Sequence, residues 1–323
     1  MYRYIVNRVL MMIPVIIGVT FLIFFMMDLA PGDATDVVAM EYSEEALQQL
    51  REDLHLDEPL LVRYFIYMKD LLRGDLGYSY MSQVHVWDLY VQRFPYTLVL
   101  AVSSVLLGVV LSIPLGILAA KKNGSLTDNA CTVAAMFGLS VPNFWFGLLL
   151  ILLFSKILGW FPSYGADEGW KSLVLPAITV GIDTMAALVR TTRSSMLDVL
   201  RADYLRTARA KGVDERVVIN KHGLRNALIP IITVFGGQLG GAFGGAVITE
   251  NVFTWPGLGQ SLVAGIKARD TTLVCGFIIM FVIMISVTQL LVDLAYAFVD
   301  PRIKSQYASG KTKKRAQKGG VQA

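Results

Sequence analysis

The basic residues best placed to bind another molecule gather in residues 200–230, between two apolar runs. Seven Lys or Arg residues face only three acids there. Ala, Leu and Arg favour helix, so we expect a helix as far as Lys211, a stop at Gly212 and a second short helix from Asp214 through Asn220. The sequence thus predicts a compact, charged pair of helices. A solvated loop whose charge only sets membrane topology is the alternative.

Two carboxylates lie within or near apolar runs, Asp183 and Asp293. Carboxylates inside a membrane are costly, which makes both of them functional candidates, for example as a proton relay. The structural alternative is pairing near the inner interface, with Arg190 the expected partner of Asp183. The three histidines, at positions 55, 85 and 222, are far apart in the sequence and predict no metal site.

The sequence carries no GxxxxGK[ST] phosphate loop, no nucleophile elbow and no HExxH helix, so we predict a non-catalytic chain without a cofactor of its own. Cys131 and Cys275 both fall in apolar stretches, which favours two small buried thiols over a disulfide framework or a CxxC metal site.

The composition requires a membrane. Hydrophobic residues make up 54% of the chain, charged residues 17%, and the mean hydropathy is +0.55. A bilayer core of ~30 Å needs about 20 apolar residues in a helix. We therefore predict an all-α integral membrane protein with six transmembrane helices, at about 9–27, 94–120, 129–158 (interrupted by Pro142), 173–189, 229–250 and 271–299.

Charge gives the orientation. Most of the 29 Lys and Arg residues fall at the two termini, in the short loop after residue 120 and in the basic stretch, whereas residues 33–58 are rich in Asp and Glu. The positive-inside rule then places both termini in the cytoplasm. We expect a first transmembrane helix at 1–28, an extracytoplasmic helical segment at 29–93, a five-helix core at 94–299 with a cytoplasmic loop at 190–229, and a basic tail at 300–323.

The spacing from Ala208 to Gly212 resembles the EAA loop of bacterial ABC-importer permeases, the element that docks into the ATP-binding subunit. The run 203–212 resembles the dipeptide/oligopeptide/nickel branch of this family, although the founding pattern has Glu where this chain has Arg206. Matching stretches occur along the chain as far as the basic tail, at 30–33, 74–79, 140–145, 193–196, 224–230, 250–259 and 299–303.

The resemblance implies a B-type permease subunit that forms half of a translocation pathway for di- or oligopeptides in a bacterial or archaeal cytoplasmic membrane. Its implied partners are a second homologous permease, two cytoplasmic ATP-binding subunits that carry ATP and Mg, an extracytoplasmic substrate-binding protein and the lipid bilayer, with no nucleic acid. The residues implied for coupling to the ATPases are Arg206, Thr207, Ala208, Lys211, Gly212, Val213, Asp214 and Glu215.

Glycines repeat every four residues in the fifth predicted span. Such a face lets helix backbones approach closely. It could pack inside one subunit, or it could line the translocation path and the permease interface, where bare backbone suits a peptide-like substrate. The residues are Gly236, Gly237, Gly240, Gly241, Gly244 and Gly245.

Three alternatives remain at this point. The same mechanism could carry nickel or another small solute. A proton-coupled secondary carrier would use Asp183 and Asp293 and would work without ATPase partners. A membrane anchor or signalling subunit would bind partners without any flux.

Overall fold

The computed structural model describes residues 2–29, 32, 34–38 and 43–299. The predicted basic tail at 300–323 therefore lies outside the described residues. The helices of the N-terminal part are α1 (Tyr2–Leu29), α2 (Ala34–Val38), α3 (Glu44–Asp53) and α4 (Leu60–Leu71), followed by a hairpin of β1 (Tyr78–Ser79) and β2 (Val84–His85).

The rest of the described chain is helical and follows the hairpin directly. Its elements are α5 (Val86–Lys121), α6 (Leu126–Ser140), α7 (Asn143–Leu150), the π-helical η1 (Ile151–Ile157), α8 (Trp170–Leu200), α9 (Asp203–Ala210), α10 (Glu215–Val217), the π-helical η2 (Val218–Gly223), α11 (Leu224–Val252), α12 (Leu258–Lys267) and α13 (Thr271–Val299).

Within the described residues, five helices are long and apolar enough to cross a membrane, and six spans result if the bent pair α6 and α7–η1 is one of them. The predicted all-α membrane fold is therefore confirmed, while the count of six spans, the cytoplasmic termini and the extracytoplasmic segment stay predictions. The helix that holds the fourth predicted span is longer than that span, because α8 continues from Trp170 to Leu200 and includes Arg190 and Arg193. The membrane limits only the apolar part of a helix, and a charged extension remains helical beyond it.

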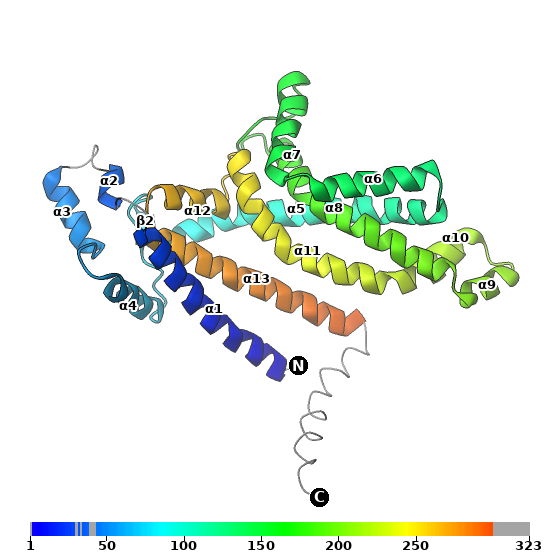
Figure 1. Ribbon diagram of the computed structural model, residues 1–323, viewed down its shortest axis with the longest axis horizontal. Helices are drawn as coiled ribbons and strands as arrows, with labels where there is room; N and C mark the ends of the chain where they lie inside the picture. The colour runs from blue at the N-terminus through cyan, green and yellow to red at the C-terminus, as the bar shows by residue number, and fades with distance from the viewer. Residues whose placement is uncertain (1, 30–31, 33, 39–42, 300–323) are drawn as a thin grey trace, which may run out of the picture.

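The predicted interruption at Pro142 is a sharp bend, since α6 and α7–η1 meet at 109°. The residue before a proline is pushed out of the helical region, and Val141 has the extended angles φ −88° and ψ 127°. Pro142 then begins a new helix with φ −60°. Figure 1 shows α7 standing across the direction of α6 and α8.

The core is formed by α5, α8 and α11, which pack along one another. Small residues bring α5 and α8 together, because a Cβ on Gly181 would lie only 2.8 Å from the backbone oxygen of Ser104. An ion pair between Arg193 and the buried Asp128 fastens α6 to α8, with Arg193 Nη2 2.8 Å from Asp128 Oδ2. On the other side of the core, α1 packs on α13.

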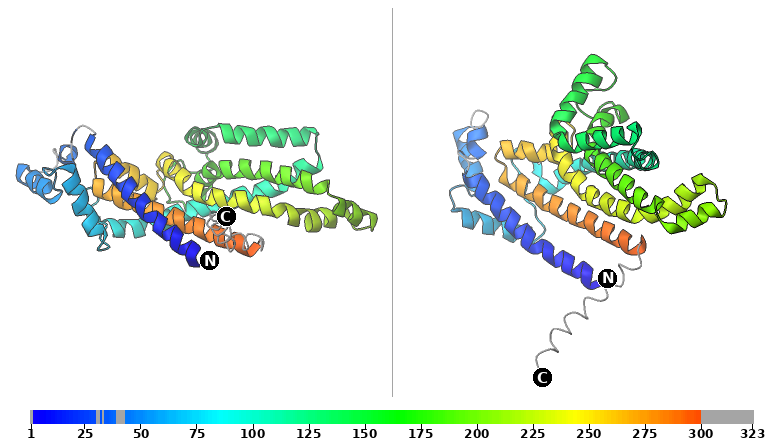
Figure 2. Two further views of the ribbon diagram at one scale, coloured as in Figure 1. Left: turned by 60° about the horizontal axis from the view of Figure 1, so that its bottom comes forward. Right: turned by 45° about the vertical axis from the view of Figure 1, so that its right-hand side comes forward.

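The N-terminal helices and the basic stretch lie at opposite ends of the molecule. Figure 1 places α2, α3 and α4 at one end of the long axis and α9 and α10 at the other, and the two views in Figure 2 agree. Two local signals bound the N-terminal helices, since Ser43 caps α3 by accepting a hydrogen bond from the Ala46 N–H at 3.3 Å and Gly74 follows α4 with φ +84°.

Candidate functional site

The basic segment, defined here as residues 203–223, consists of α9, α10 and η2. Helix α9 ends at Ala210, and Gly212 turns the chain with φ +75°, a conformation that glycine adopts without strain. The Asp214 side chain accepts a hydrogen bond from the Arg216 N–H at 2.8 Å and so caps the next helix, as expected. That helix does not stop at Asn220, because η2 leads without a break into α11.

Two apolar side chains anchor the basic segment. Leu205 of α9 and Val218 of η2 are fully buried, while the Arg209 guanidinium donates two hydrogen bonds of 3.0 Å to the Glu215 carboxylate across the turn. These bonds raise the pKa of Arg209. The two buried side chains and this ion pair therefore hold the charged surface in one conformation. The residues expected to couple to the ATPases all lie on it, six exposed (Arg206, Thr207, Lys211, Gly212, Asp214, Glu215) and two partly exposed (Ala208, Val213).

The six glycines of α11 differ in how far the rest of the described chain covers them. Gly236 is buried, Gly240 and Gly245 are partly exposed, and Gly237, Gly241 and Gly244 are exposed. A Cβ on Gly237 or Gly244 would meet no atom of the described chain within 4 Å. The exposed glycines continue an uncovered strip on α11, here called the glycine strip, of Thr233, Gly237, Gly241, Gly244 and Ile248.

A buried carboxylate joins α11 to α12 and α5. Glu250 is 0% exposed and accepts hydrogen bonds from the Thr97 hydroxyl at 2.6 Å, the Gly259 N–H at 2.6 Å and the Gln260 N–H at 3.1 Å. A Cβ on Gly259 would lie 2.9 Å from Val247 Cβ, so glycine is needed for this approach. The carboxylate therefore fixes the start of α12 against the end of α11.

Both membrane carboxylates have partners. Asp293 forms an ion pair with Arg8 of α1, at 3.2 Å between Oδ2 and Nη1. Asp183 Oδ2 accepts a hydrogen bond of 2.7 Å from Asn143 Nδ2, at the bend between α6 and α7. The expected pairing of Asp183 with Arg190 is thus replaced by a contact with a residue 40 positions earlier. The geometry supports a structural role for Asp293, while Asp183 sits beside the bend.

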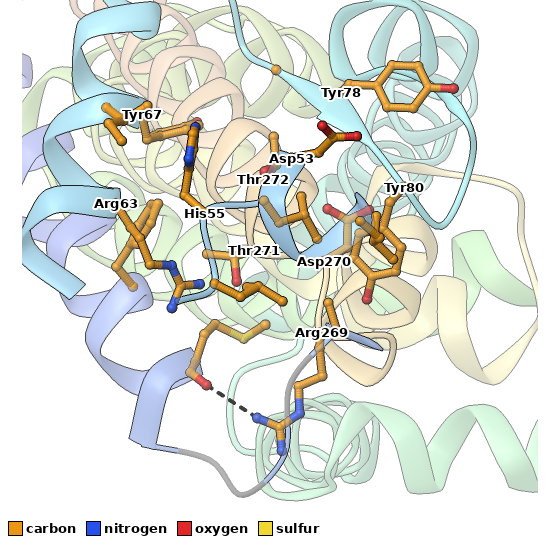
Figure 3. A pocket seen from close by; sticks show the side chains of 18 of the residues that line it. Asp53, His55, Arg63, Tyr67, Tyr78, Tyr80, Arg269, Asp270, Thr271 and Thr272 are labelled. Atoms are coloured by element: carbon orange, nitrogen blue, oxygen red, sulfur yellow. Dashed lines mark hydrogen bonds between the residues drawn. The ribbon is translucent and has the colours of Figure 1, made fainter. Parts of the chain in front are cut away.

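A cavity of about 540 Å³ lies between the N-terminal helices and the turn before α13. Figure 3 shows its lining, with Arg63 and Tyr67 from α4 and with Tyr80, Arg269 and Asp270 from other elements, and marks the bond from Arg269 to Met27 O. Burial raises the pKa of Tyr67.

The cavity's wall is fixed by Asp270, which accepts hydrogen bonds from the Ser79 hydroxyl at 2.6 Å and the Leu273 N–H at 3.0 Å. Burial raises the pKa of this carboxyl, and the hydrogen bonds oppose that shift. The hairpin β1–β2 is thereby held to the start of α13.

Comparison with known proteins decides the family. Residues 112–305 match the binding-protein-dependent transport system inner membrane component, and residues 1–101 match its N-terminal family. The chain belongs to this permease family. It is therefore a non-catalytic, multi-pass component of a bacterial ABC transporter in the inner membrane.

The permease is similar to relatives over nearly all of its length. It is 41% identical over 315 residues to the oligopeptide transport system permease protein AppB of Bacillus subtilis, covering 94% of this chain and 100% of that protein. It is 39% identical over 305 residues to the glutathione transport system permease protein GsiC of Escherichia coli K12, covering 94% and 99%.

A solved structure has the same fold. A chain of the MetNI methionine ABC transporter in an inward-facing conformation superposes with a TM-score of 0.56 at 20% identity, covering 66% of this permease and 96% of that chain.

Sequence reasoning missed three polar residues that organise the permease. The sequence places Glu250 only at the end of a predicted span and Asn143 only in a stretch that resembles the family, and it does not single out Asp270. Glu250 precedes the turn with Pro256 and Gly257, and Asn143 follows Pro142, whereas Asp270 has neither proline nor glycine beside it. That signal shows where a turn lies, but the partner of each residue comes from a distant part of the chain.

Proposed function

We propose that this permease is half of the translocation pathway of an ATP-driven importer of short peptides. The observation that carries the proposal is its similarity, over 94% of this chain and 100% of the other, to a permease named for oligopeptide transport. A second relative is named for glutathione, itself a tripeptide, and favours small peptides as a substrate class. A second homologous permease would supply the other half of the pathway.

The basic segment is the proposed docking surface for the cytoplasmic ATP-binding subunits. It is exposed, charged and anchored by Leu205 and Val218, so a push on it moves the helices it joins. It follows α8 and continues directly into α11, two helices of the core. Movement of the ATPases would therefore reach the pathway through packed helices rather than through a loose loop.

The glycine strip is the proposed contact with the second permease along the pathway. Bare backbone at Gly237, Gly241 and Gly244 lets another helix or a peptide approach closely. The ATPases bind ATP and Mg on their own chains and close. That closure favours one of two conformations of the permease pair. The difference in ATP affinity between the two conformations drives the change from one to the other. An extracytoplasmic binding protein delivers the peptide to the opposite side.

A pair of matched glycine substitutions tests the docking surface. Gly212 has φ +75° and its N–H donates to Arg209 O at 2.9 Å, and Gly74 has φ +84° and its N–H donates to Leu71 O at 2.9 Å. Proline removes the N–H and fixes φ near −65°. Each substitution therefore disrupts a turn of the same kind, one after α4 and one after α9, at opposite ends of the molecule.

The measurement is co-purification from native membranes in mild detergent, with the partners identified by mass spectrometry. We expect the wild-type chain to retain a second permease and ATP-binding subunits, Gly212→Pro to lose only the ATP-binding subunits, and Gly74→Pro to retain both. Equal losses in the two variants contradict docking at the basic segment. A wild-type chain that purifies alone and moves solute in vesicles, sensitive to an uncoupler, is a secondary carrier instead.

A further inference from the structure

We propose that Asp183 and Asn143 bind the protonated amino group of the transported peptide inside the membrane pathway. The inference rests on the proposed function, because it assigns a substrate contact to that pathway. It is carried by three features: a carboxylate near the middle of α8, the bend between α6 and α7, and Gly245 of α11, which lies beside Asn143 and follows Gly244 of the glycine strip.

Asp183 lies inside the apolar part of α8, predicted to span the membrane at 173–189. It is 10 residues from the start of that stretch and 6 from its end, or about 15 Å and 9 Å along a helix that rises ~1.5 Å per residue. Its side chain is partly exposed, and one oxygen, Oδ2, accepts the bond from Asn143. In the described part of the chain, the other oxygen, Oδ1, accepts no hydrogen bond. A carboxylate at this depth needs a positive partner, and the described chain supplies a neutral amide.

Asn143 has an unused acceptor as well. Its Oδ1 is buried and has no hydrogen-bond partner among the residues that the structure describes. An unpaired buried carbonyl oxygen is costly, so a donor at this position would stabilise it. One hydrogen-bonded pair thus offers two vacant oxygens. A primary ammonium carries three N–H donors and a positive charge, and so satisfies both oxygens and the carboxylate charge.

The pair borders the proposed pathway. A Cβ on Gly245 would lie 4.0 Å from Asn143 Nδ2, and the exposed Gly241 and Gly244 lie on the same helix. The bend at Pro142 interrupts a span at this point, and interrupted membrane helices commonly frame substrate sites. A peptide moving along the glycine strip would therefore pass Asp183.

The chemistry favours an amine over a metal ion. One carboxylate and one amide give too few ligands for a divalent cation, and no three His, Cys, Asp or Glu residues of the described chain are grouped to hold one. The amino terminus of a peptide has a pKa of about 8 and is largely protonated at neutral pH. Because this group is common to peptides of different sequence, a site for it accepts many side chains.

Thiol protection tests the site without involving the binding protein. In a chain with Cys131→Ser and Cys275→Ala, Gly244→Cys places a thiol on the glycine strip. The complex of this chain with its second permease and ATPases is reconstituted in vesicles, and the thiol is alkylated in each nucleotide state. Trialanine and N-acetyl-trialanine are then compared as protecting ligands, since they differ in the charge of the amino end.

We expect trialanine to protect the thiol and N-acetyl-trialanine to fail. Asp183→Asn should raise the half-protecting concentration of trialanine by about tenfold or more, the effect of losing a hydrogen bond to a charged group. Asp183→Glu keeps the charge and should stay within about threefold of wild type. Asp88→Asn, an equal change at an exposed position at the start of α5, should have no effect.

Equal protection by the two peptides, an unchanged half-protecting concentration in Asp183→Asn, or a thiol that never reacts would each overturn the assignment. ATP-dependent uptake of trialanine by the wild-type complex, measured with the substrate-binding protein added, separates this failure from failure of the proposed function. If uptake is present and Asp183→Asn leaves it unchanged, only the amine site is wrong. If the wild-type complex shows no ATP-dependent uptake of any peptide, the proposed function is wrong as well.

Discussion

Removing the Glu250 carboxylate should destabilise the junction of α11 and α12. The perturbation is Glu250→Ala, which deletes the acceptor of three buried hydrogen bonds. The Thr97 hydroxyl can rotate to another acceptor, but the N–H groups of Gly259 and Gln260 are fixed by the backbone. Each buried donor left without a partner costs ~1–3 kcal/mol, so the two together cost about 2–6 kcal/mol.

Glu250→Gln is the conservative variant, because it keeps the side-chain volume and an oxygen acceptor. The amide oxygen can still accept both backbone N–H bonds, so we expect a loss of only about 1 kcal/mol. Glu168→Ala is the control, because Glu168 is an exposed residue just before α8 at the same end of the core. It should change stability by less than about 0.5 kcal/mol.

The assay is thermal unfolding of the detergent-solubilised protein, followed by the loss of the monodisperse peak in size-exclusion chromatography. In soluble domains of 150–250 residues, 1 kcal/mol corresponds to about 2–4 °C in Tm. On this scale, Glu250→Ala should lower Tm by at least roughly 4 °C, with Glu250→Gln between it and wild type. A Tm for Glu250→Ala within about 1 °C of the Glu168→Ala control would refute the role assigned to this carboxylate.

Two further predictions concern packing and pH. Gly259→Ala should lower stability by about 1–3 kcal/mol, because the added Cβ would clash with Val247. Gly244→Ala should be neutral or slightly stabilising, because its Cβ would meet no atom of the described chain. The Tm values of the two variants test both expectations. Burial raises the pKa of Asp270 above its ordinary 3.8, so the native state holds this proton more tightly than the unfolded chain does. The resulting stabilisation is complete below the ordinary pKa and is lost as pH rises through the native one. Wild type should therefore lose Tm relative to Asp270→Asn as pH rises from 4 to about 8, and a pH-independent difference would contradict this.

The sequence was sufficient wherever a signal is local. The turn at Gly212 and the cap at Asp214 depend on residues within a few positions, and both occur as expected. The bend after Val141 is also local, because proline excludes the helical conformation of the residue before it. Its size of 109° was not predictable, since neighbouring helices decide how far a broken helix turns.

The glycine repeat shows the limit of one-dimensional periodicity. Spacing by four places residues on one side of α11, but it cannot tell which part of that side is covered by the same chain. In the structure Gly236 is buried, while Gly237 and Gly244 are open. Only the packing of neighbouring helices against α11 identifies its exposed glycines as a candidate interface.

By itself, the sequence determined that this is an integral membrane protein, because apolar runs of ~20 residues are long enough to cross a bilayer as helices. The charged residues that flank these runs predict which side of the membrane each end faces. It also determined the local turns. The tertiary structure alone decided the pairs that couple distant segments: Thr97 with Glu250, Ser79 with Asp270, and Asn143 with Asp183. A buried polar group needs a partner, but its type and spacing do not say which helix will supply it, because that depends on how the helices pack.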